Sequence, residues 1–565
     1  MLFQTNQSKL YLDAANNSVS KKINNSHSNS LWNIWSIGEL TYKKNNLIEF
    51  LNDLSNSTLQ PHELNGHFLI IGYNRKQQTW NFWTSRFGTI HIYYSTHSKY
   101  SHISTYYPTL PSQYDTELDL VAMMGYFKTG IFPADLTWYK TNKIIRPATH
   151  ATFDRTGKLI QQKRYWNWSF EPNYTRSYTQ TLDEFTELYT KVINELSQHD
   201  KVAIPLSGGL DSRSTIAALS PQNKNWSNLH TFSYGYSNDS IETRISEKLA
   251  KACQLPFKKY TIQPYLFNSL PEVLKNVEGF QDITQSRQAM ITTDLAKNSE
   301  FIIAAHLGDL LLDHMGLPDS PLTKIEIYNN LTTKFNKPGS LWLTENFIPF
   351  KKNPEVKQEY HALMQQELDS YLYLKDNNFI TKVFKIDQWS FRWTLASLRM
   401  YQASVFPRLP FYDTRITDFL CTVPNHYLKN RKLQIDFIKK KSPKLGRIIW
   451  EKYNSNLYHY TYHNSLLLPK RALYKAWRII TRNQPILRNW EVQFLNPAGK
   501  DSLIKVILNN QHITKGLFTK EQLTQIIDDF YKNPFLEKKG YTISALLTFI
   551  SSLALFSPSL KKELK

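Results

Sequence analysis

The stretch VAIPLSGGLDSR, residues 202–213, decides the expected fold. Val202–Leu206 is a short apolar run typical of a strand, Ser207–Gly209 forms a tight turn, and a helix-compatible segment starts at Asp211. Glycine lets the backbone approach an anion, and the helix that follows offers unpaired N–H groups and the positive end of its dipole. The stretch therefore predicts a strand, a phosphate-binding loop and a helix N-terminus.

The side chains of this loop add to the phosphate site. Ser207 and Ser212 supply hydroxyl donors, whereas Asp211 would repel a phosphate unless a divalent cation lies between them, so its presence predicts Mg²⁺. The loop lacks the Lys-Ser/Thr ending of a Walker A motif, which argues against ordinary kinase or GTPase chemistry. A chance Ser-Gly-Gly turn is the alternative. The expected nucleotide-binding residues of the loop are Leu206, Ser207, Gly208, Gly209, Asp211 and Ser212.

Composition limits the class of protein. A chain of 565 residues with 41% hydrophobic and 14% aromatic residues predicts two or more globular domains. Cys253 and Cys421 are too few for a disulfide framework or a cysteine zinc site, which fits a reducing cytoplasm. Met1–Gln4 leads into polar sequence without the features of a signal peptide. The apolar stretch Ile543–Phe556 is shorter than a membrane span, so we expect a buried helix and a cytoplasmic protein.

The net charge of +21 raises the question of anionic partners. Lysine is spread widely along the chain rather than massed in one block, which favours a solvated basic surface. We therefore expect no nucleic-acid partner, while peripheral contact with an anionic membrane surface stays open. The sequence does not predict the oligomeric state.

The first part of the chain has the pattern of an antiparallel β domain. Hairpin strands are expected over Gly66–Asn74, Thr79–Thr84 and Ile90–Tyr94, followed by a helix over Leu118–Thr129. A further strand pair begins at residue 143 and ends near residue 167.

From about residue 180 strands and helices alternate. A helix is expected over Ile241–Cys253, and later residues are mostly helical. Alternation implies a parallel sheet with the nucleotide at the carboxyl ends of its strands. The expected strands are Val202–Leu206, His230–Tyr234, Lys258–Ile262 and Phe301–Ala305.

Several motifs in the same order resemble one family. SGGLDS (207–212) resembles the pyrophosphate loop of ATP pyrophosphatases, which activate a carboxylate as its adenylate. The Gly-x-Phe strand, the Arg86-Phe87-Gly88 turn and the Arg-Tyr-Trp exit resemble the glutaminase domain of asparagine synthetases. TFSYG (231–235), DITQSR (282–287) and RLPFYD (408–413) resemble the family's adenine strand, adenylate-pocket segment and Arg-x-Pro-Phe-x-Asp block. The chain is identified as a member of the asparagine synthetase family, close to its asparagine synthase-like and β-lactam synthetase-like branches.

This resemblance implies an α/β protein of two domains. Residues 1–170 would form a glutamine amidotransferase type 2-like domain, an antiparallel β sandwich of the N-terminal nucleophile hydrolase type. Residues 180–565 would form an asparagine synthetase-like ATP-pyrophosphatase domain with a parallel sheet and a helical C-terminal part. The resemblance further implies that Ser233, Tyr234 and Ala305 contact ATP and that Thr284 and Arg287 contact the substrate.

The first departure from the family concerns the glutaminase nucleophile. The glutamine-using members carry a cysteine directly after the initiator Met, where this sequence has Leu2. Cys253 and Cys421 cannot replace it, because the mechanism needs a chain-terminal amine beside the thiol. We expect an N-terminal domain without glutaminase activity. A different start codon is the competing explanation.

The second departure lies in the segment AAHLGD, residues 304–309. The resemblance places His306 where asparagine synthetases carry Glu and β-lactam synthetases carry Tyr, and it makes Asp309 the second Mg²⁺ ligand beside Asp211. His306 could take a proton from an attacking amine, because its free pKa lies near neutrality. A structural histidine is the alternative, and Asp313 and His314 are reserve candidates.

The family's chemistry implies an AMP-forming carbon–nitrogen ligase that uses ATP and Mg²⁺. Arg287 would stabilise charge on the acyl-adenylate. Lys452 is the candidate for the lysine that closes on the pyrophosphate, and Lys439–Lys441 compete for that role. His306, Arg287 and Lys452 are therefore the candidate catalytic residues.

The acceptor stays open. Asparagine biosynthesis from aspartate is the plainest assignment, but the two departures argue against it. Specialised relatives amidate sugar uronates, cyclise peptides or close β-lactams, with ammonia or a substrate amine as the nitrogen source. A catalytically degenerate basic scaffold and a tRNA-modifying pyrophosphatase are further alternatives, and the presence of both metal acids argues against the scaffold.

Overall fold

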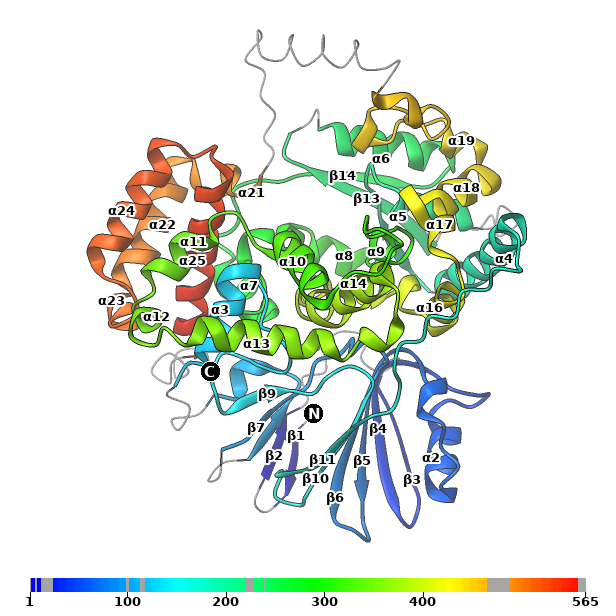
Figure 1. Ribbon diagram of the computed structural model, residues 1–565, viewed down its shortest axis with the longest axis horizontal. Helices are drawn as coiled ribbons and strands as arrows, with labels where there is room; N and C mark the ends of the chain where they lie inside the picture. The colour runs from blue at the N-terminus through cyan, green and yellow to red at the C-terminus, as the bar shows by residue number, and fades with distance from the viewer. Residues whose placement is uncertain are drawn as a thin grey trace.

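The computed structural model describes residues 2–5, 8–11, 24–97, 101–111, 117–198, 200–219, 228–237, 240–464 and 488–556. Antiparallel strands of the N-terminal part form one end of the molecule, below the parallel sheet and the helices in Figure 1. The most C-terminal helices lie to one side of the parallel sheet (Figure 1). The expected α/β class, with an antiparallel N-terminal part, a parallel sheet and a helical C-terminal part, is confirmed.

Two sheets build the N-terminal part. The six-stranded sheet is antiparallel throughout, with strand order β11-β10-β6-β5-β4-β3, and the five-stranded sheet has the order β1-β2-β8-β7-β9, with β2 and β8 parallel. Leu69 and Ile71 of one sheet share a buried cluster with Tyr94 and Ile103 of the other, so the sheets pack face to face. The strands are β1 Leu2–Thr5, β2 Ser8–Tyr11, β3 Asn24–Ser28, β4 Trp32–Thr41, β5 Asn65–Asn74, β6 Thr79–Thr84, β7 Tyr93–Ser95, β8 His102–Ser104, β9 Asn142–Ile144, β10 Thr149–Phe153 and β11 Leu159–Arg164.

Residue alternation explains how the six-stranded sheet is covered on both faces. Leu69 and Ile71 of β5 face the other sheet, whereas Phe68 and Ile70 pack with Phe50 of helix α2 (Leu47–Asn56). Successive side chains of a strand point to opposite faces, so β5 is buried on both. The expected strand Ile90–Tyr94 was wrong at its start, because β7 begins only at Tyr93.

The second sheet is parallel and has the order β14-β13-β12-β15-β16. All four expected strands are confirmed, with shifts of one or two residues at their ends. The fifth strand, β16, was not expected, because three residues without alternation give no strand pattern. The strands are β12 Val202–Pro205, β13 Leu229–Gly235, β14 Phe257–Thr261, β15 Phe301–Ile303 and β16 Phe406–Arg408.

The remaining described chain is largely helical, as expected. Helix α3 shows how the sequence sets helix ends: the Asp119 side chain accepts from the Ala122 N–H, and Gly130 ends the helix in the left-handed region. The other helices are α4 Tyr178–Ser197, α5 Asp211–Ala218, α6 Ile241–Ala252, α7 Leu270–Val277, α8 Thr292–Asn298, α9 Gly308–Leu311, α10 Lys324–Phe335, α11 Ser340–Asn346, α12 Ile348–Lys352, α13 Val356–Asp369, α14 Asn377–Lys385, α15 Leu395–Gln402, α16 Thr414–Cys421, α17 Asn425–Leu428, α18 Lys432–Lys441, α19 Pro443–Gly446, α21 Asn489–Phe494, α22 Pro497–Asn509, α23 Gln511–Thr514, α24 Lys520–Lys532 and α25 Glu537–Phe556, beside α3 Leu120–Thr129 and the π-helical stretch η7 Ile386–Thr394.

Helix α25 (Glu537–Phe556) is long and apolar enough to cross a membrane by length and composition, with a mean hydropathy of 1.3. Of its most apolar window, 72% is buried inside the protein, which confirms the expected buried helix. The expectation that it is shorter than a membrane span was wrong, because the helix starts at Glu537, before the apolar run.

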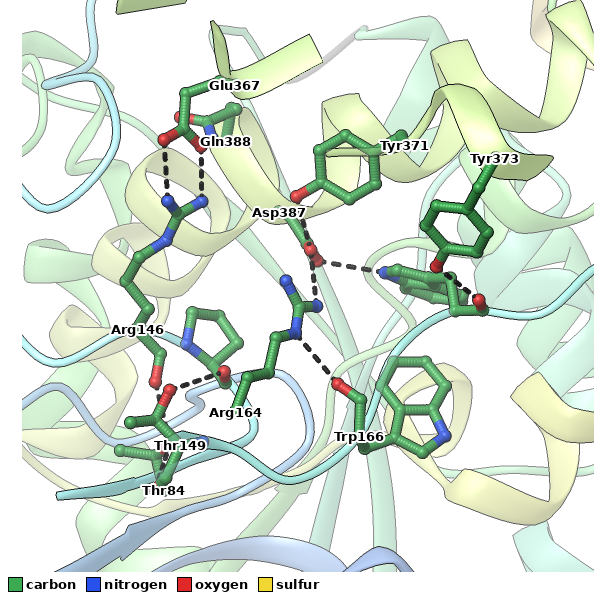
Figure 2. Close-up of polar contacts among 12 residues, drawn as sticks. Thr84, Arg146, Thr149, Arg164, Trp166, Glu367, Tyr371, Tyr373, Asp387 and Gln388 are labelled. Carbon is green, nitrogen blue, oxygen red and sulfur yellow. Dashed lines mark hydrogen bonds and ion pairs between the residues drawn. The ribbon is translucent and has the colours of Figure 1, made fainter. Parts of the chain in front are cut away.

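A group of buried polar residues, which we call the seam network, joins the N-terminal strands to the later helices (Figure 2). Arg146 donates two hydrogen bonds to Glu367 of α13, at 2.8 and 2.6 Å. Arg164 donates to Asp387 of η7 at 2.7 Å, and Asp387 also accepts from the Tyr371 hydroxyl at 2.7 Å. The network consists of Arg146, Arg164, Trp168, Glu367, Tyr371, Asp387 and Gln388.

Candidate nucleotide-binding site

The parallel sheet reverses its strand order between β12 and β15. The chain runs from β12 to β13 and β14 on one side and later places β15 and β16 on the other side of β12. Such a reversal leaves a crevice at the carboxyl ends of the strands, where α/β proteins bind ligands. Asp211 is the first residue of α5, which follows β12, and Asp309 lies in α9, which follows β15, so both lie beyond the carboxyl ends of these strands.

The loop after β12 is organised by its own hydroxyl groups. The Ser207 N–H donates to Ser212 Oγ at 3.0 Å, and the two hydroxyl oxygens lie 3.2 Å apart. The Leu206 N–H donates to the Phe232 carbonyl of β13 at 2.7 Å, which fixes the loop to the sheet. Helix α5 begins at Asp211, and no N-cap side chain accepts a hydrogen bond from the N–H groups of its first turn.

Strand β13 extends past the end of β12. The last pair between them is Pro205 with Phe232, whereas β13 runs on to Gly235. Because Phe232 accepts from Leu206 on the β12 side, alternation places the peptide groups of Tyr234 on that same side, beyond the end of β12. Tyr234 thus offers backbone groups to a nucleobase, whereas the peptide groups of Ser233 face β14.

Arg287 lies between two tyrosine rings at the end of β13. Its guanidinium carbon is 5.3 Å from the centroid of Tyr234 and 6.0 Å from that of Tyr236, and its Nη1 donates to the Tyr236 hydroxyl at 3.1 Å. Nearby, burial raises the pKa of Glu242 to about 7, the charge of Glu451 adds to the rise, and Arg287 opposes it. Acidic and basic groups therefore crowd together beside the strand that would hold the nucleobase.

The hydroxyl of Thr284, the other expected substrate residue, is not free to contact a substrate. Its side chain is fully buried, its Oγ1 donates to Asp282 at 2.7 Å, and its carbonyl accepts from Asn489 at 2.5 Å. The Asp282 side chain, which also accepts from the Thr284 N–H at 2.9 Å, caps the turn η4 (Ile283–Gln285). Ala305, in contrast, is half-buried, two residues after the end of β15.

His306 lies on a strained turn between β15 and α9, and Asp309 lies in the first turn of α9. Leu307 adopts φ 78°, ψ −13°, and a leucine in this left-handed region costs on the order of 1–3 kcal/mol. Burial lowers the pKa of His306, and the charge of Asp309 opposes the shift. Nδ1 of His306 is buried without a hydrogen-bond partner among the described residues. Burial thus favours the neutral imidazole, with a ring nitrogen that no described residue engages.

The reserve candidates after α9 are engaged in a turn. The His314 N–H donates to Asp313 Oδ1 at 2.8 Å, and His314 Nδ1 accepts from the Gly316 N–H at 2.9 Å. These contacts leave His306 as the better proton acceptor.

Lys452 lies on the short helix η10 (Glu451–Tyr453) and is exposed, 5.9 Å from the Trp450 ring centroid. Its neighbour Glu451 reaches the phosphate loop, where its N–H donates to the Gly208 carbonyl at 3.3 Å. Two of the three competing lysines are engaged on α18, since Lys439 pairs with Asp436 at 3.4 Å and Lys440 pairs with Asp183. Lys452 is thus adjacent in the chain to a residue that touches the loop.

The sequence analysis missed the groups that hold Asp211. Arg431 forms an ion pair with its carboxylate, and Gln434 Nε2 donates to Asp211 Oδ1 at 3.1 Å. Burial raises the pKa of Asp211, Arg431 opposes this shift, and Asp309 adds to it. No local signal could have found these partners, because Arg431 lies 220 residues further along the chain.

Asp211 and Asp309 are close enough to interact electrostatically. Gly308, the residue before Asp309, packs tightly against the Asp211 carboxylate. A Cβ on Gly308 would lie 2.5 Å from Asp211 Oδ1. Among the described residues, no group of three or more His, Cys, Asp or Glu could hold a metal by itself. Two carboxylates beside a phosphate loop nevertheless fit Mg²⁺, which is commonly held by one or two carboxylates together with substrate phosphates.

Residues 186–312 match the asparagine synthase family model. No curated protein matches the sequence significantly. Among solved structures, a glutamine-dependent NAD⁺ synthetase from Acinetobacter baumannii in complex with ADP is 17% identical, with a TM-score of 0.18, and the match covers 32% of this chain and 33% of that chain. An NH3-dependent NAD synthetase from Campylobacter jejuni in complex with nitrate is 16% identical, with a TM-score of 0.20, over 37% of this chain and 93% of that chain. The chain thus spans about a third of the length of the first of these structures.

Proposed function

We propose that this protein is an ATP-dependent ligase that forms an amide through an acyl-adenylate, with release of AMP and pyrophosphate; the match of residues 186–312 to the asparagine synthase family model supports this. One observation carries the proposal. The SGGLDS loop, Asp211 and Asp309 lie at the carboxyl ends of β12 and β15, where the strand order of the parallel sheet reverses.

In the proposed first step, a substrate carboxylate oxygen attacks the α-phosphorus of ATP, and the bond to the pyrophosphate oxygen breaks. The N–H groups at the start of α5 and the hydroxyls of Ser207 and Ser212 hold the leaving pyrophosphate. Asp211 and Asp309 would hold Mg²⁺, which neutralises charge on the phosphates when bound. Arg287 offers a guanidinium to the substrate carboxylate or the adenylate.

In the proposed second step, an amine nitrogen attacks the acyl carbon and AMP leaves. His306 accepts the proton that the nitrogen loses, for which its neutral form and unpartnered Nδ1 suit it. The nitrogen comes from ammonia or from an amine of a substrate, because the sequence has Leu2 in place of the nucleophilic cysteine.

We further propose that the acceptor is a small-molecule, sugar or peptide carboxylate. Aspartate, a sugar uronate and a peptide or β-amino acid are the three classes to test. The departures at Leu2 and His306 favour a specialised acceptor over glutamine-dependent asparagine synthesis.

ATP–pyrophosphate exchange against a panel of these carboxylates tests the proposal. We expect exchange that depends on one carboxylate class and on Mg²⁺, and Asp211→Asn serves as the inactive control. Absence of exchange with every carboxylate, together with no binding of MgATP, would contradict the enzyme assignment and leave a basic scaffold.

A further inference from the structure

Arg213 follows the SGGLDS loop directly and is fully buried in helix α5. Its guanidinium donates to four backbone carbonyls: Gly208 at 3.4 Å, Leu445 at 3.3 Å, Ile448 at 2.9 Å and Ile449 at 2.8 Å. No carboxylate forms an ion pair with it among the described residues, in contrast to Arg146 and Arg164 of the seam network. A buried cation held only by carbonyls is costly, so its placement calls for an explanation beyond packing.

The four carbonyls belong to two different parts of the molecule. Gly208 lies in the phosphate loop, and the other three lie in and after the short helix α19 (Pro443–Gly446). Arg213 therefore ties the phosphate loop to the segment 445–449. The next residues of that segment are those of η10, which carry Glu451 and Lys452.

Held in this way, the segment places a carboxylate on the phosphate loop. A Cβ on Gly208 would lie 2.6 Å from Glu451 Oε2, so the Glu451 carboxylate occupies the space directly above the glycine that a phosphate would approach. Partial desolvation against the loop raises the pKa of Glu451, although the residue as a whole is exposed. A carboxylate at this point repels pyrophosphate.

Lys452, the next residue, is exposed. Consecutive residues of a 3₁₀ turn are about 120° apart around its axis. Lys452 therefore does not share the position of Glu451 on Gly208; its Nζ lies 5.3 Å from the Tyr453 ring centroid.

We propose that Arg213 is a positioning residue of the nucleotide site: it holds the segment 445–451 against the phosphate loop, so that the pyrophosphate end of ATP must displace Glu451 from Gly208 before it binds. This inference rests on the proposed function of the loop. Because Glu451 touches Gly208 of the loop, we expect its effect on the pyrophosphate end of the nucleotide and not on AMP.

The sign of the change in pyrophosphate affinity tests whether Glu451 must be displaced. Glu451→Gln removes the repelling charge, so we expect pyrophosphate and MgATP to bind about three- to tenfold more tightly, with AMP binding unchanged, by isothermal titration calorimetry. Lys444→Met, which changes an exposed charge of the same segment, is the matched control and should leave pyrophosphate binding unchanged. Unchanged or weaker pyrophosphate binding by Glu451→Gln would overturn the proposal.

The role of Arg213 is tested by Arg213→Lys and Arg213→Met. Lysine keeps the charge but cannot reach carbonyls in both segments, so both variants should raise the KM for ATP roughly tenfold or more while AMP affinity is kept. Arg447→Met, an exposed arginine of the same segment, should leave both quantities unchanged. Equal loss of AMP and ATP binding in a folded variant would contradict a positioning role, and if neither Arg213 variant folds, the Glu451→Gln result alone decides. Failure of the wild-type protein to bind either MgATP or pyrophosphate would instead overturn the proposed function.

Discussion

The seam network and the nucleotide site are both rich in buried charge, but they treat that charge differently. In the seam network each carboxylate faces a guanidinium, and Asp387 accepts hydrogen bonds from Arg164, Tyr371 and Trp168. In the nucleotide site, burial raises the pKa of Asp211, Glu242 and Glu451. Matched charge of the first kind joins parts of a fold, whereas crowded and partly unpartnered charge marks a place where a ligand completes the set.

The largest expected effect is at Asp211. Asp211→Asn removes one of the two carboxylates beside the phosphate loop, so we expect loss of ATP–pyrophosphate exchange by a factor of roughly 10³ or more. Asp211→Asn also leaves the guanidinium of Arg431 without its carboxylate, so we expect the free energy of unfolding to fall as well, while the protein stays folded. ATP–pyrophosphate exchange rates measure the loss of activity, and thermal unfolding measures the change in stability. Asp309→Asn should lose exchange in the same way. Unchanged turnover in folded Asp211→Asn would reject the metal assignment.

The opposite outcome is expected in the seam network. Asp387→Asn leaves the half-buried Arg164 without its carboxylate and weakens the hydrogen bonds that Asp387 accepts, which should lower the free energy of unfolding by about 1–3 kcal/mol. The folded fraction should keep its ATP–pyrophosphate exchange. Denaturant unfolding measures the loss, and a stability unchanged within experimental error would show that the seam network does not hold the fold together.

A smaller and more selective effect is expected at His306. His306→Gln should keep ATP–pyrophosphate exchange and lose roughly 10²-fold in amide product, because only the second step needs a proton acceptor. Comparing the two half-reactions in one folded variant gives the answer. An equal loss in both would assign His306 to the fold and leave the base to the substrate or to His314.

The smallest effect is a pH dependence from Glu242. Its pKa rises from 4.5 to about 7 on folding, so the folded state binds the proton more tightly than the unfolded state. The contribution of Glu242 to stability is therefore complete below about pH 4.5 and is lost as pH rises through 7. Urea unfolding of the wild type and of Glu242→Gln between pH 5 and about 8 should show this slope only in the wild type. If the free energy of unfolding of both proteins changed with pH in the same way, folding would not raise the pKa of Glu242.

Much of the fold was predictable because local patterns encode it. The strands β12 and β15 are short apolar runs, and the alternation of β12 to β15 with helices placed all four in one parallel sheet. Strand β16 was missed, because Phe406–Arg408 is a strand only through its pairing with β15. The start of α25 was missed too, because its polar first turn, Glu537–Lys539, hides the length of the helix.

The sequence by itself determined the phosphate loop, the acids Asp211 and Asp309 and the departures at Leu2 and His306, because each lies in a short motif whose chemistry is local. Only the tertiary structure decided which groups meet those residues. Arg431 and Gln434 reach Asp211, and Arg213 reaches Ile448 and Ile449, across more than 200 residues of chain. The physical reason is that burial and charge pairing depend on distance in space, which the folding of helices α18 and α19 over the loop sets and no local pattern records.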